Sequence, residues 1–102
     1  MLASFSIVPI GVGDELKEFI AELVPIIEKS GLSYVMGAMQ TTVEGEPEQV
    51  LDLIMTCHRH MRIRAPRVLT HMAIDDRQDA KGRLKGKVRD VETMLGKGIS
   101  HE

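Results

Sequence analysis

EPEQVLDLIMTCHRHMRIR, residues 46–64, followed by RVLTHMAID, residues 67–75, decides the fold of this chain. The first stretch has Pro47 at its start, acidic residues in its first turn and arginines near its end, an order of charges that suits a helix dipole. The second stretch follows an Ala-Pro break and is typical of a strand. A long helix followed by a strand forms one half of a fold in which strands and helices alternate. The residues before it are therefore expected to form the other half.

The first third of the chain has the same order of elements. Residues 2–9, LASFSIVP, alternate between the two faces of a predicted strand, and Pro9 and two glycines mark its end. A helix is expected to begin at Asp14, whose side chain can cap it, and to end at Gly31. Pro25 lies inside this helix and removes one backbone hydrogen bond, so we expect a kink there. The apolar stripe of the helix consists of Leu16, Phe19, Ile20, Leu23 and Ile27.

Residues 32–45, LSYVMGAMQTTVEG, connect the two halves and predict a β-hairpin with strands at roughly 32–38 and 40–45. A short amphipathic helix is expected after the last strand. The order β-α-β-β-α-β plus a terminal helix is the split βαβ pattern. We therefore predict the α+β class, a ferredoxin-like βαββαβ sandwich whose four-stranded antiparallel sheet carries two long helices on one face, plus a short C-terminal helix. One domain is expected over residues 1–96, followed by a flexible tail at 97–102.

The face of the sheet away from the two long helices has a mixed composition. It is less polar than a face left in water and too polar for a sealed core, so we expect it to pack against another copy or around a ligand. His71 on this face is open to two interpretations, a packing residue or a ligand contact. The residues of this face are Ser4, Ser6, Val8, Leu69, His71 and Ala73.

Composition narrows the classes of partner. A chain of 102 residues is long enough for one domain with one core. Its net charge of −2 and aromatic content of 3% provide neither a basic surface nor a stacking platform, so nucleic acid is not expected. No apolar run approaches the roughly 20 residues that span a bilayer, so no membrane partner is expected either. The single cysteine cannot form an internal disulfide and the first residues lack signal-peptide features, which predicts a cytoplasmic location.

Three parts of the chain together resemble a known family. They are SIVPIGVG at 6–13, GAMQTTVEGE at 37–46, and RVLTHMAIDDRQD at 67–79 with LKGKVRDVE at 84–92. In this combination the chain resembles the small thiamine-binding protein family, which is YkoF-like in its two-domain relatives. The resemblance implies ferredoxin-like domains that associate through their sheets into dimers and tetramers. It also implies binding of thiamine or its hydroxymethylpyrimidine moiety, with no catalysis and no further cofactor.

The resemblance also directs attention to particular side chains. Thiamine has a cationic thiazolium and an aminopyrimidine, so hydroxyls, a carboxylate and flexible methionines would supply acceptors, charge and apolar walls. Tyr34 is the one residue able to stack broadly on a ring. We expect the ligand where Ser6, Thr42 and Glu44 converge near a subunit interface. The full predicted ligand-binding set is Ser6, Pro9, Tyr34, Met39, Thr41, Thr42, Glu44 and Asp75.

The stretch MTCHRHMR, residues 55–62, brings a cysteine and two histidines close together in sequence. On a helix, His58 and His60 are about 200° apart around the axis, so they cannot hold one ion together. Cys57 and His60 could share an ion, but two ligands fall short of the three or four that zinc needs. A thiol turned toward the sheet is also shielded from acting as a nucleophile. We therefore predict no metal and no catalytic site, with Cys57 as a small buried hydrophobe.

Two charged segments have both a functional and a structural interpretation. Asp75, Asp76 and Asp79 around Arg77 could bind a cation or act in acid-base chemistry, but a solvated loop with salt bridges is favoured. The basic residues 83, 85, 87 and 89 could attract a phosphate, but a solvated helix face is favoured. The sequence therefore predicts a binding protein. The alternatives are a structural or regulatory oligomeric module without a small-molecule ligand and, least favoured, an enzyme that uses the carboxylates.

Overall fold

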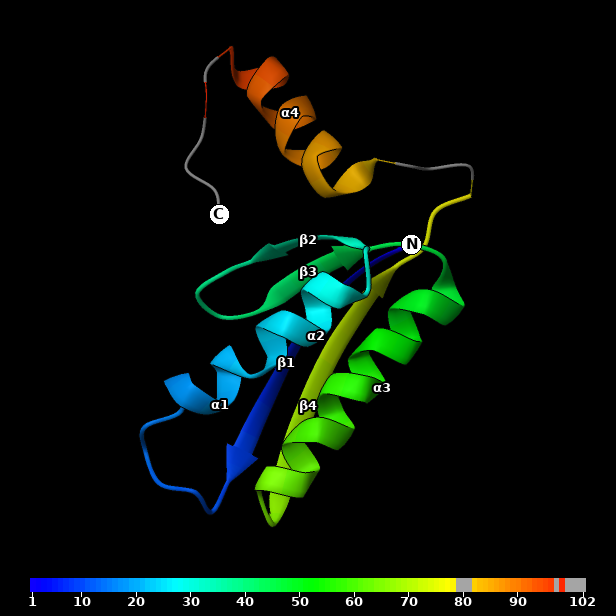
Figure 1. Ribbon diagram of the computed structural model, residues 1–102. Coiled ribbons are helices and arrows are strands. Elements are labelled where there is room, and N and C mark those ends of the chain that lie inside the picture. Colours follow the sequence, from blue (N-terminus) through cyan, green and yellow to red (C-terminus); the bar gives the residue numbers. More distant parts are fainter. Residues whose placement is uncertain (79–81, 97, 99–102) are drawn as a thin grey trace.

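A computed structural model describes residues 1–78, 82–96 and 98, with the exception of the side chain at position 87 (Figure 1). It confirms the predicted α+β fold: one four-stranded antiparallel sheet in the order β2-β3-β1-β4, with α1, α2 and α3 on one face and α4 beside the other face. None of the described helices is long and apolar enough to cross a membrane. The elements are β1 (Leu2–Ile10), α1 (Lys17–Ala21), α2 (Leu23–Lys29), β2 (Ser33–Met36), β3 (Thr41–Glu44), α3 (Pro47–Arg64), β4 (Arg67–Asp75) and α4 (Arg83–Leu95).

The register of the sheet assigns each side chain to one of two faces. Residues directly opposite each other in an antiparallel pair point to the same side. Ser4 lies opposite Thr42 on β3 and Ala73 on β4, and Ser6 lies opposite His71. These residues share the face away from α2 and α3, here called the open face. The prediction of a mixed composition for this face is confirmed.

The other face of the sheet forms the core with α2 and α3. Alternate residues of β1 are buried here, as period-2 spacing requires. The helices add residues at helical spacing, and the buried stripe of α3 removes apolar area from water along nearly its whole length. The core cluster is Ala3, Phe5, Ile7, Leu23, Ile27, Val43, Val50, Leu53, Ile54, Cys57 and Met61.

The first helical segment is divided, and it begins later than predicted. Pro25 has no N–H to donate to the carbonyl oxygen of Ala21, so α1 ends at Ala21 and α2 begins at Leu23. The predicted kink is therefore a break that lies about one turn before the proline. Asp14 does not cap a helix, because α1 begins at Lys17 after a turn that contains two glycines with positive φ, and its N-cap, Leu16, makes no side-chain hydrogen bond.

The remaining element boundaries follow local signals that the sequence carries. Gly31, with φ of +75°, follows Ser30, the C-cap residue of α2, and therefore occupies the C′ position as predicted. The β2–β3 hairpin is closed by a hydrogen bond of 2.8 Å from the Gly37 N–H to the Gln40 carbonyl. Pro47 lies in the first turn of α3, and Gly96, with φ of +68°, follows α4. The predicted tail at 97–102 lies outside the described residues, apart from position 98.

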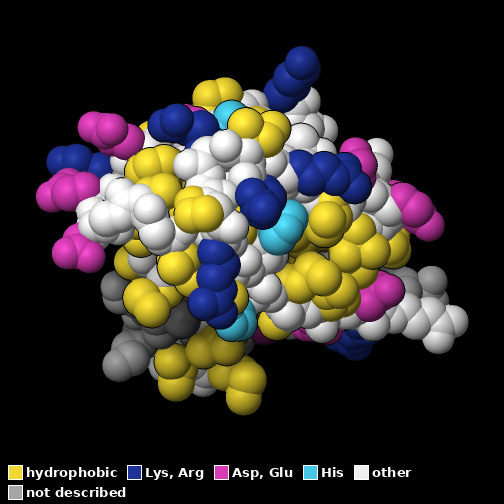
Figure 2. Space-filling view, turned by 90° about the horizontal axis from the view of Figure 1, so that it is seen from below, with side chains coloured by type: hydrophobic (Ala, Val, Ile, Leu, Met, Phe, Trp, Pro, Cys, Tyr) yellow, Lys and Arg dark blue, Asp and Glu magenta, His cyan; other side chains and the backbone are white. Residues whose placement is uncertain are grey.

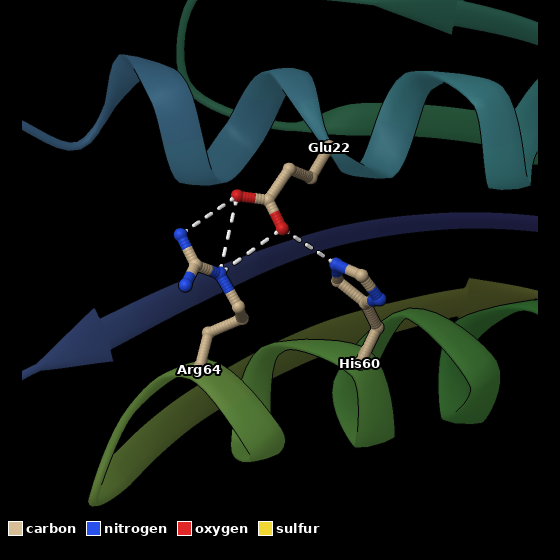
Figure 3. A network of polar contacts seen from close by, with 3 residues as sticks. All are labelled: Glu22, His60 and Arg64. Carbon is tan, nitrogen blue, oxygen red and sulfur yellow. Dashed lines mark hydrogen bonds and ion pairs between the residues drawn. The ribbon is translucent and has the colours of Figure 1, made fainter.

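A polar network joins the break between α1 and α2 to α3 (Figure 3). Glu22 Oε1 accepts a hydrogen bond from His60 Nε2 at 2.8 Å, and Arg64 Nη2 lies 3.1 Å from Glu22 Oε2. The Arg64 guanidinium also lies over the Phe19 ring, 5.0 Å from its centroid. The hydrogen bonds from His60 and Arg64 hold the pKa of Glu22 below its usual value of 4.5. This network fixes the first helical segment at a point where its own backbone bonding is interrupted.

Substituting Glu22→Gln is expected to reduce the sensitivity of the fold to acid. Because the folded-state pKa of Glu22 is lowered, its contribution to stability is present above pH 4.5 and is lost as the pH falls through the lowered pKa. The melting temperature of the parent should therefore fall more steeply than that of the variant between about pH 5 and pH 3. Glu28→Gln removes the same charge from an exposed site and serves as the control. Identical pH profiles for the parent and Glu22→Gln would contradict a stabilising role for the network.

Candidate functional site

The open face and α4 border an open, solvent-accessible cavity of about 370 Å³, here called the sheet cavity. This volume lies within the range of about 300–1,000 Å³ that is common for small-molecule sites. The sheet supplies hydroxyl and carboxylate groups, and α4 supplies an apolar wall and an arginine. Leu2 is buried although it belongs to the open face, because α4 covers this end of the sheet. The cavity is lined chiefly by Leu2, Ser4, Gln40, Thr42, Ala73, Asp75, Arg83, Leu84 and Val88.

Glu44 anchors α4 beside the sheet cavity. Its Oε2 atom accepts a hydrogen bond of 2.8 Å from the backbone N–H of Arg83, the first residue of α4. The first N–H groups of a helix have no partner within the helix, and a carboxylate is favoured at this positive end. Glu44 therefore holds the helix that forms one wall of the cavity. Its carboxylate is already engaged in this contact in the described structure.

The side chain of Arg83 leaves one donor without a partner. Its Nη2 atom donates to Asp90 Oδ2 at 3.0 Å, whereas its buried Nε–H has no hydrogen-bond acceptor. A buried donor without an acceptor is unfavourable by about 1–3 kcal/mol. Arg83 lines the sheet cavity, but its Nε atom is itself buried, so the side chain must rotate before a bound molecule can accept from this donor. The cavity thus combines an unsatisfied donor with hydroxyls and a carboxylate.

A second cavity of about 150 Å³ lies on the other side of the β2–β3 hairpin, and is here called the loop cavity. It is mostly apolar, with Phe5, Ile20 and Leu23 among its lining residues. Ser6 and Thr41 contribute the hydroxyls, and Thr41 is 8% exposed. Its volume is below the usual range for a small-molecule site. We therefore regard the sheet cavity as the candidate binding site.

The predicted ligand-binding residues are divided between these places. Thr42 and Asp75 line the sheet cavity and Glu44 borders it, whereas Ser6, Met39 and Thr41 line the loop cavity. Thr41 and Thr42 point to opposite faces, with Glu44 on the side of Thr42, as the period of a strand predicts. Ser6 is therefore not in the same cavity as Thr42. Pro9 is buried on the helix face and Tyr34 packs against the core, so neither lines a described cavity.

Some residues of the site were not among the predicted ligand-binding residues. Ser4 is the neighbour of Thr42 across the sheet and lies two residues before Ser6, so strand pairing could have identified it. Gln40 lines both cavities from the hairpin loop. Leu84 and Val88 are apolar residues of the short amphipathic helix predicted after the last strand, but the sequence does not say which surface that helix covers. Arg83 was placed on a solvated helix face, and it instead lines the sheet cavity.

The Cys-His stretch makes contacts within the core and between neighbouring elements. Cys57 is fully buried in the core, and burial raises the pKa of its thiol to about 11. His58 Nδ1 lies 2.7 Å from Thr70 Oγ1 on β4, whereas His60 contacts Glu22 on the opposite side of α3. The predictions that Cys57 is a buried hydrophobe and that the two histidines diverge are confirmed. Within residues 1–78, 82–96 and 98, no three His, Cys, Asp or Glu side chains are grouped to hold a metal ion.

The charged segments after β4 are only partly described. Asp76 and Arg77 are exposed, while Asp79 lies outside the described residues. In the basic run, Lys85 and Arg89 are exposed, and the side chain of Lys87 also lies outside the described part. Among the described side chains of these two segments, Asp75 is the carboxylate that lines the sheet cavity and Arg83 is the cation that lines it.

Comparisons with known proteins agree over most of the chain. The family model described as thiamine-binding protein matches residues 3–92. A UPF0045 protein of Mycobacterium bovis is 31% identical over 96 residues, which is 93% of this chain and 94% of the relative. A UPF0045 protein of Synechocystis is 29% identical over 96 residues, 93% of this chain and 79% of the relative.

Solved structures show the same fold. A hypothetical protein from Methanocaldococcus jannaschii aligns with a TM-score of 0.82 at 24% identity, covering 88% of this chain and 93% of that one. A Thermotoga maritima protein described as a candidate for thiamine biosynthesis or salvage aligns with a TM-score of 0.77 at 28% identity. That alignment covers 88% of this chain and 96% of the Thermotoga chain. The similarity therefore includes the whole sandwich.

Proposed function

Because the chain belongs to the thiamine-binding protein family, we propose that it binds thiamine or the hydroxymethylpyrimidine moiety of thiamine in the sheet cavity, without catalysing a reaction. The observation that carries this proposal is the combination of Thr42, Asp75 and the unsatisfied Arg83 donor in one cavity of suitable volume. The description of the Thermotoga relative gives it further support.

The chemistry of the sheet cavity suits the two rings of thiamine. Once the Arg83 side chain rotates to expose its Nε–H, a pyrimidine nitrogen can accept a hydrogen bond from it, and the exocyclic amine can donate to Ser4 or Thr42. The cationic thiazolium is favoured near Asp75 and Glu44, whose two negative charges outnumber the single charge of Arg83. Leu2, Leu84 and Val88 provide apolar walls. A ligand that carries both a cation and a polar ring uses all of these groups.

The sheet-cavity proposal is tested by calorimetry with thiamine, its phosphates and hydroxymethylpyrimidine. Saturable binding is expected, and Thr42→Val should weaken it by about tenfold, the effect of one lost hydrogen bond in a desolvated site. Glu44→Gln should also weaken binding of the cationic ligands, because it removes a charge while leaving an oxygen to accept from Arg83. Thr56→Val on the exposed surface of α3 is the matched control and should bind as the parent does.

Two results of this calorimetry would contradict the proposal. Folded protein that shows no saturable binding at millimolar concentrations of these compounds would exclude them as ligands. Equal binding by Thr42→Val and Thr56→Val would place the site elsewhere. The absence of saturable binding would favour the alternative function, a structural or regulatory module that requires no ligand.

We also propose that the chain self-associates as a dimer or tetramer. Away from the sheet cavity, the open face retains partly exposed apolar side chains, including Val8 at 36% and Leu69 at 39% exposure. Contiguous apolar surface of this kind is often covered by a second protein chain. The mixed face would then be partly occupied by a ligand and partly by another copy.

A further inference from the structure

An open groove of about 470 Å³ lies between the end of α2 and the N-terminal half of α3, and is here called the helix groove. The two helices lie side by side on one face of the sheet (Figure 1). The helix groove is therefore on the opposite side of the sheet from the sheet cavity. It shares no lining residue with the sheet cavity or the loop cavity. Its volume exceeds that of the sheet cavity and lies within the usual range for small-molecule sites.

The floor of the helix groove is apolar and adjoins the core. Leu53 is 4% exposed and belongs to the core cluster. Ile26 and Leu32 are partly buried and pack against the same cluster. An aliphatic group placed in the groove would contact these three side chains and remove apolar surface from water, which favours binding.

Lys29 and Asp52 give the helix groove one charge of each sign. Lys29 is the last residue of α2, and Asp52 lies in the second turn of α3. Both are exposed, and neither makes an ion pair with a described side chain. The two charges are therefore not neutralised by each other. Opposite charges on separate helices, above an apolar floor, suit a ligand that itself carries one charge of each sign.

The remaining polar groups of the groove differ in their availability. Gln49 lies three residues before Asp52, on the same side of α3, and its amide can both donate and accept a hydrogen bond. The hydroxyls of Ser30 and Thr56 also line the groove, but each donates to a backbone carbonyl oxygen of the preceding turn. Lys29, Gln49 and Asp52 are therefore the groups that can orient a ligand.

The charges of α3 distinguish the two ends of this helix. Its N-terminal half carries carboxylates, and its C-terminal half carries arginines. Figure 2 views the molecule from the end at which α3 finishes, and it shows Lys and Arg side chains across the middle of that surface. An ammonium group would be repelled there. The helix groove lies beside the acidic half of α3, where an ammonium group is favoured.

We propose that the helix groove binds a free α-amino acid with an aliphatic side chain. The ammonium group lies against Asp52, the carboxylate accepts hydrogen bonds from Lys29 and Gln49, and the side chain covers the apolar floor. Because the charges of the described lining residues cancel, a zwitterion is favoured over a simple anion or cation. The site does not depend on the thiamine proposal, because it lies on the other side of the sheet.

Titration of the intact chain with L-leucine, followed in heteronuclear NMR spectra at neutral pH, tests this site. Saturable shifts are expected for the backbone amides of Leu32, Asp52 and Leu53. Because the charged groups are exposed, each contact is weak, and a dissociation constant of about 1 mM is expected. Glycine lacks the aliphatic side chain, isoamylamine lacks the carboxylate, and isocaproate lacks the ammonium group. Each of the three should bind at least about threefold more weakly than L-leucine.

Two variants remove the charges of the groove one at a time. Asp52→Asn and Lys29→Gln should each weaken the binding of L-leucine by about three- to fivefold. Asp14→Asn and Lys17→Gln make the same changes at exposed positions near the start of α1 and should bind L-leucine as the parent does. Asp52→Asn should not weaken the binding of isocaproate, because that compound has no ammonium group. This last comparison separates loss of a specific contact from general damage to the fold.

Each outcome decides the proposal. Saturable shifts at the groove that depend on both charges would support it. Folded protein that shows no saturable shift at tens of millimolar L-leucine would overturn it, as would equal affinities for L-leucine and isoamylamine. Equal binding by Asp52→Asn and Asp14→Asn, or shifts confined to the sheet cavity, would also refute the site. Thiamine is expected to shift amides of the sheet cavity instead, so failure of one proposal does not imply failure of the other.

Discussion

Ile54→Ala is expected to lower the free energy of unfolding by about 3 kcal/mol. Ile54 is 1% exposed and lies in the core between α3 and the sheet, so truncation removes buried apolar atoms and leaves a cavity. Part of the effect is the lost transfer energy, and the rest is the lost packing around the cavity. Urea unfolding followed by circular dichroism measures the change, with an unaltered m-value expected if unfolding remains two-state.

Ile63→Ala on the same helix is the matched control for this experiment. Ile63 is 86% exposed, and its truncation should alter stability by less than about 0.5 kcal/mol. Alanine also has a slightly higher helix propensity than isoleucine, which opposes any small loss. A similar loss in both variants would show that α3 packs on the sheet through a different face.

Gly11→Ala is expected to lower the free energy of unfolding by about 3 kcal/mol, from two separate causes. The φ angle at Gly11 is +88°, which is unfavourable for any residue with a Cβ atom. That Cβ would also lie 2.9 Å from Pro66 Cγ, and a proline ring cannot rotate away as a flexible side chain can. The contact joins the end of β1 to the start of β4, so relief of the clash would displace two paired strands.

Gly13→Ala separates the two causes at Gly11. Its φ angle is similar, at +94°, but nothing lies within 4 Å of the added Cβ. It should therefore lose only the conformational part, about 1 kcal/mol, because alanine also restricts the unfolded chain. Thermal and urea unfolding of both variants measure the difference. Equal losses would mean that the Pro66 contact is relieved without consequence.

The strands and α3 could be predicted because their signals are local and periodic. Thr41 and Thr42 were assigned to opposite faces from the two-residue period alone, and Pro47 marked the start of α3. The break in the first helical segment was placed at Pro25 rather than at Glu22, because a missing N–H acts on the carbonyl four residues earlier. The start at Lys17 depends on backbone angles of the preceding glycines, which residue types do not specify.

The candidate site was less predictable because it depends on where a helix returns to the sheet. The contact between Glu44 and Arg83 spans 39 positions in sequence and uses a backbone N–H, for which no side chain provides a signal. The unsatisfied Arg83 Nε–H exists only because the surrounding atoms exclude water. The strand positions that carry hydroxyl groups could be predicted from the sequence. The position of α4 over the sheet, which makes these hydroxyls part of a cavity, could not.

The division of the first helical segment has a consequence for local stability. α1 has five residues and none of them is buried, so it is too short to be stable by itself and contributes little to the core. Its attachment relies on the Glu22 network and on Phe19, which lies under Arg64 and packs against the edge of the core. Opening α1 therefore requires much less free energy than global unfolding. Since Ile20 forms part of the wall of the loop cavity, that cavity lies beside a segment with weak local protection.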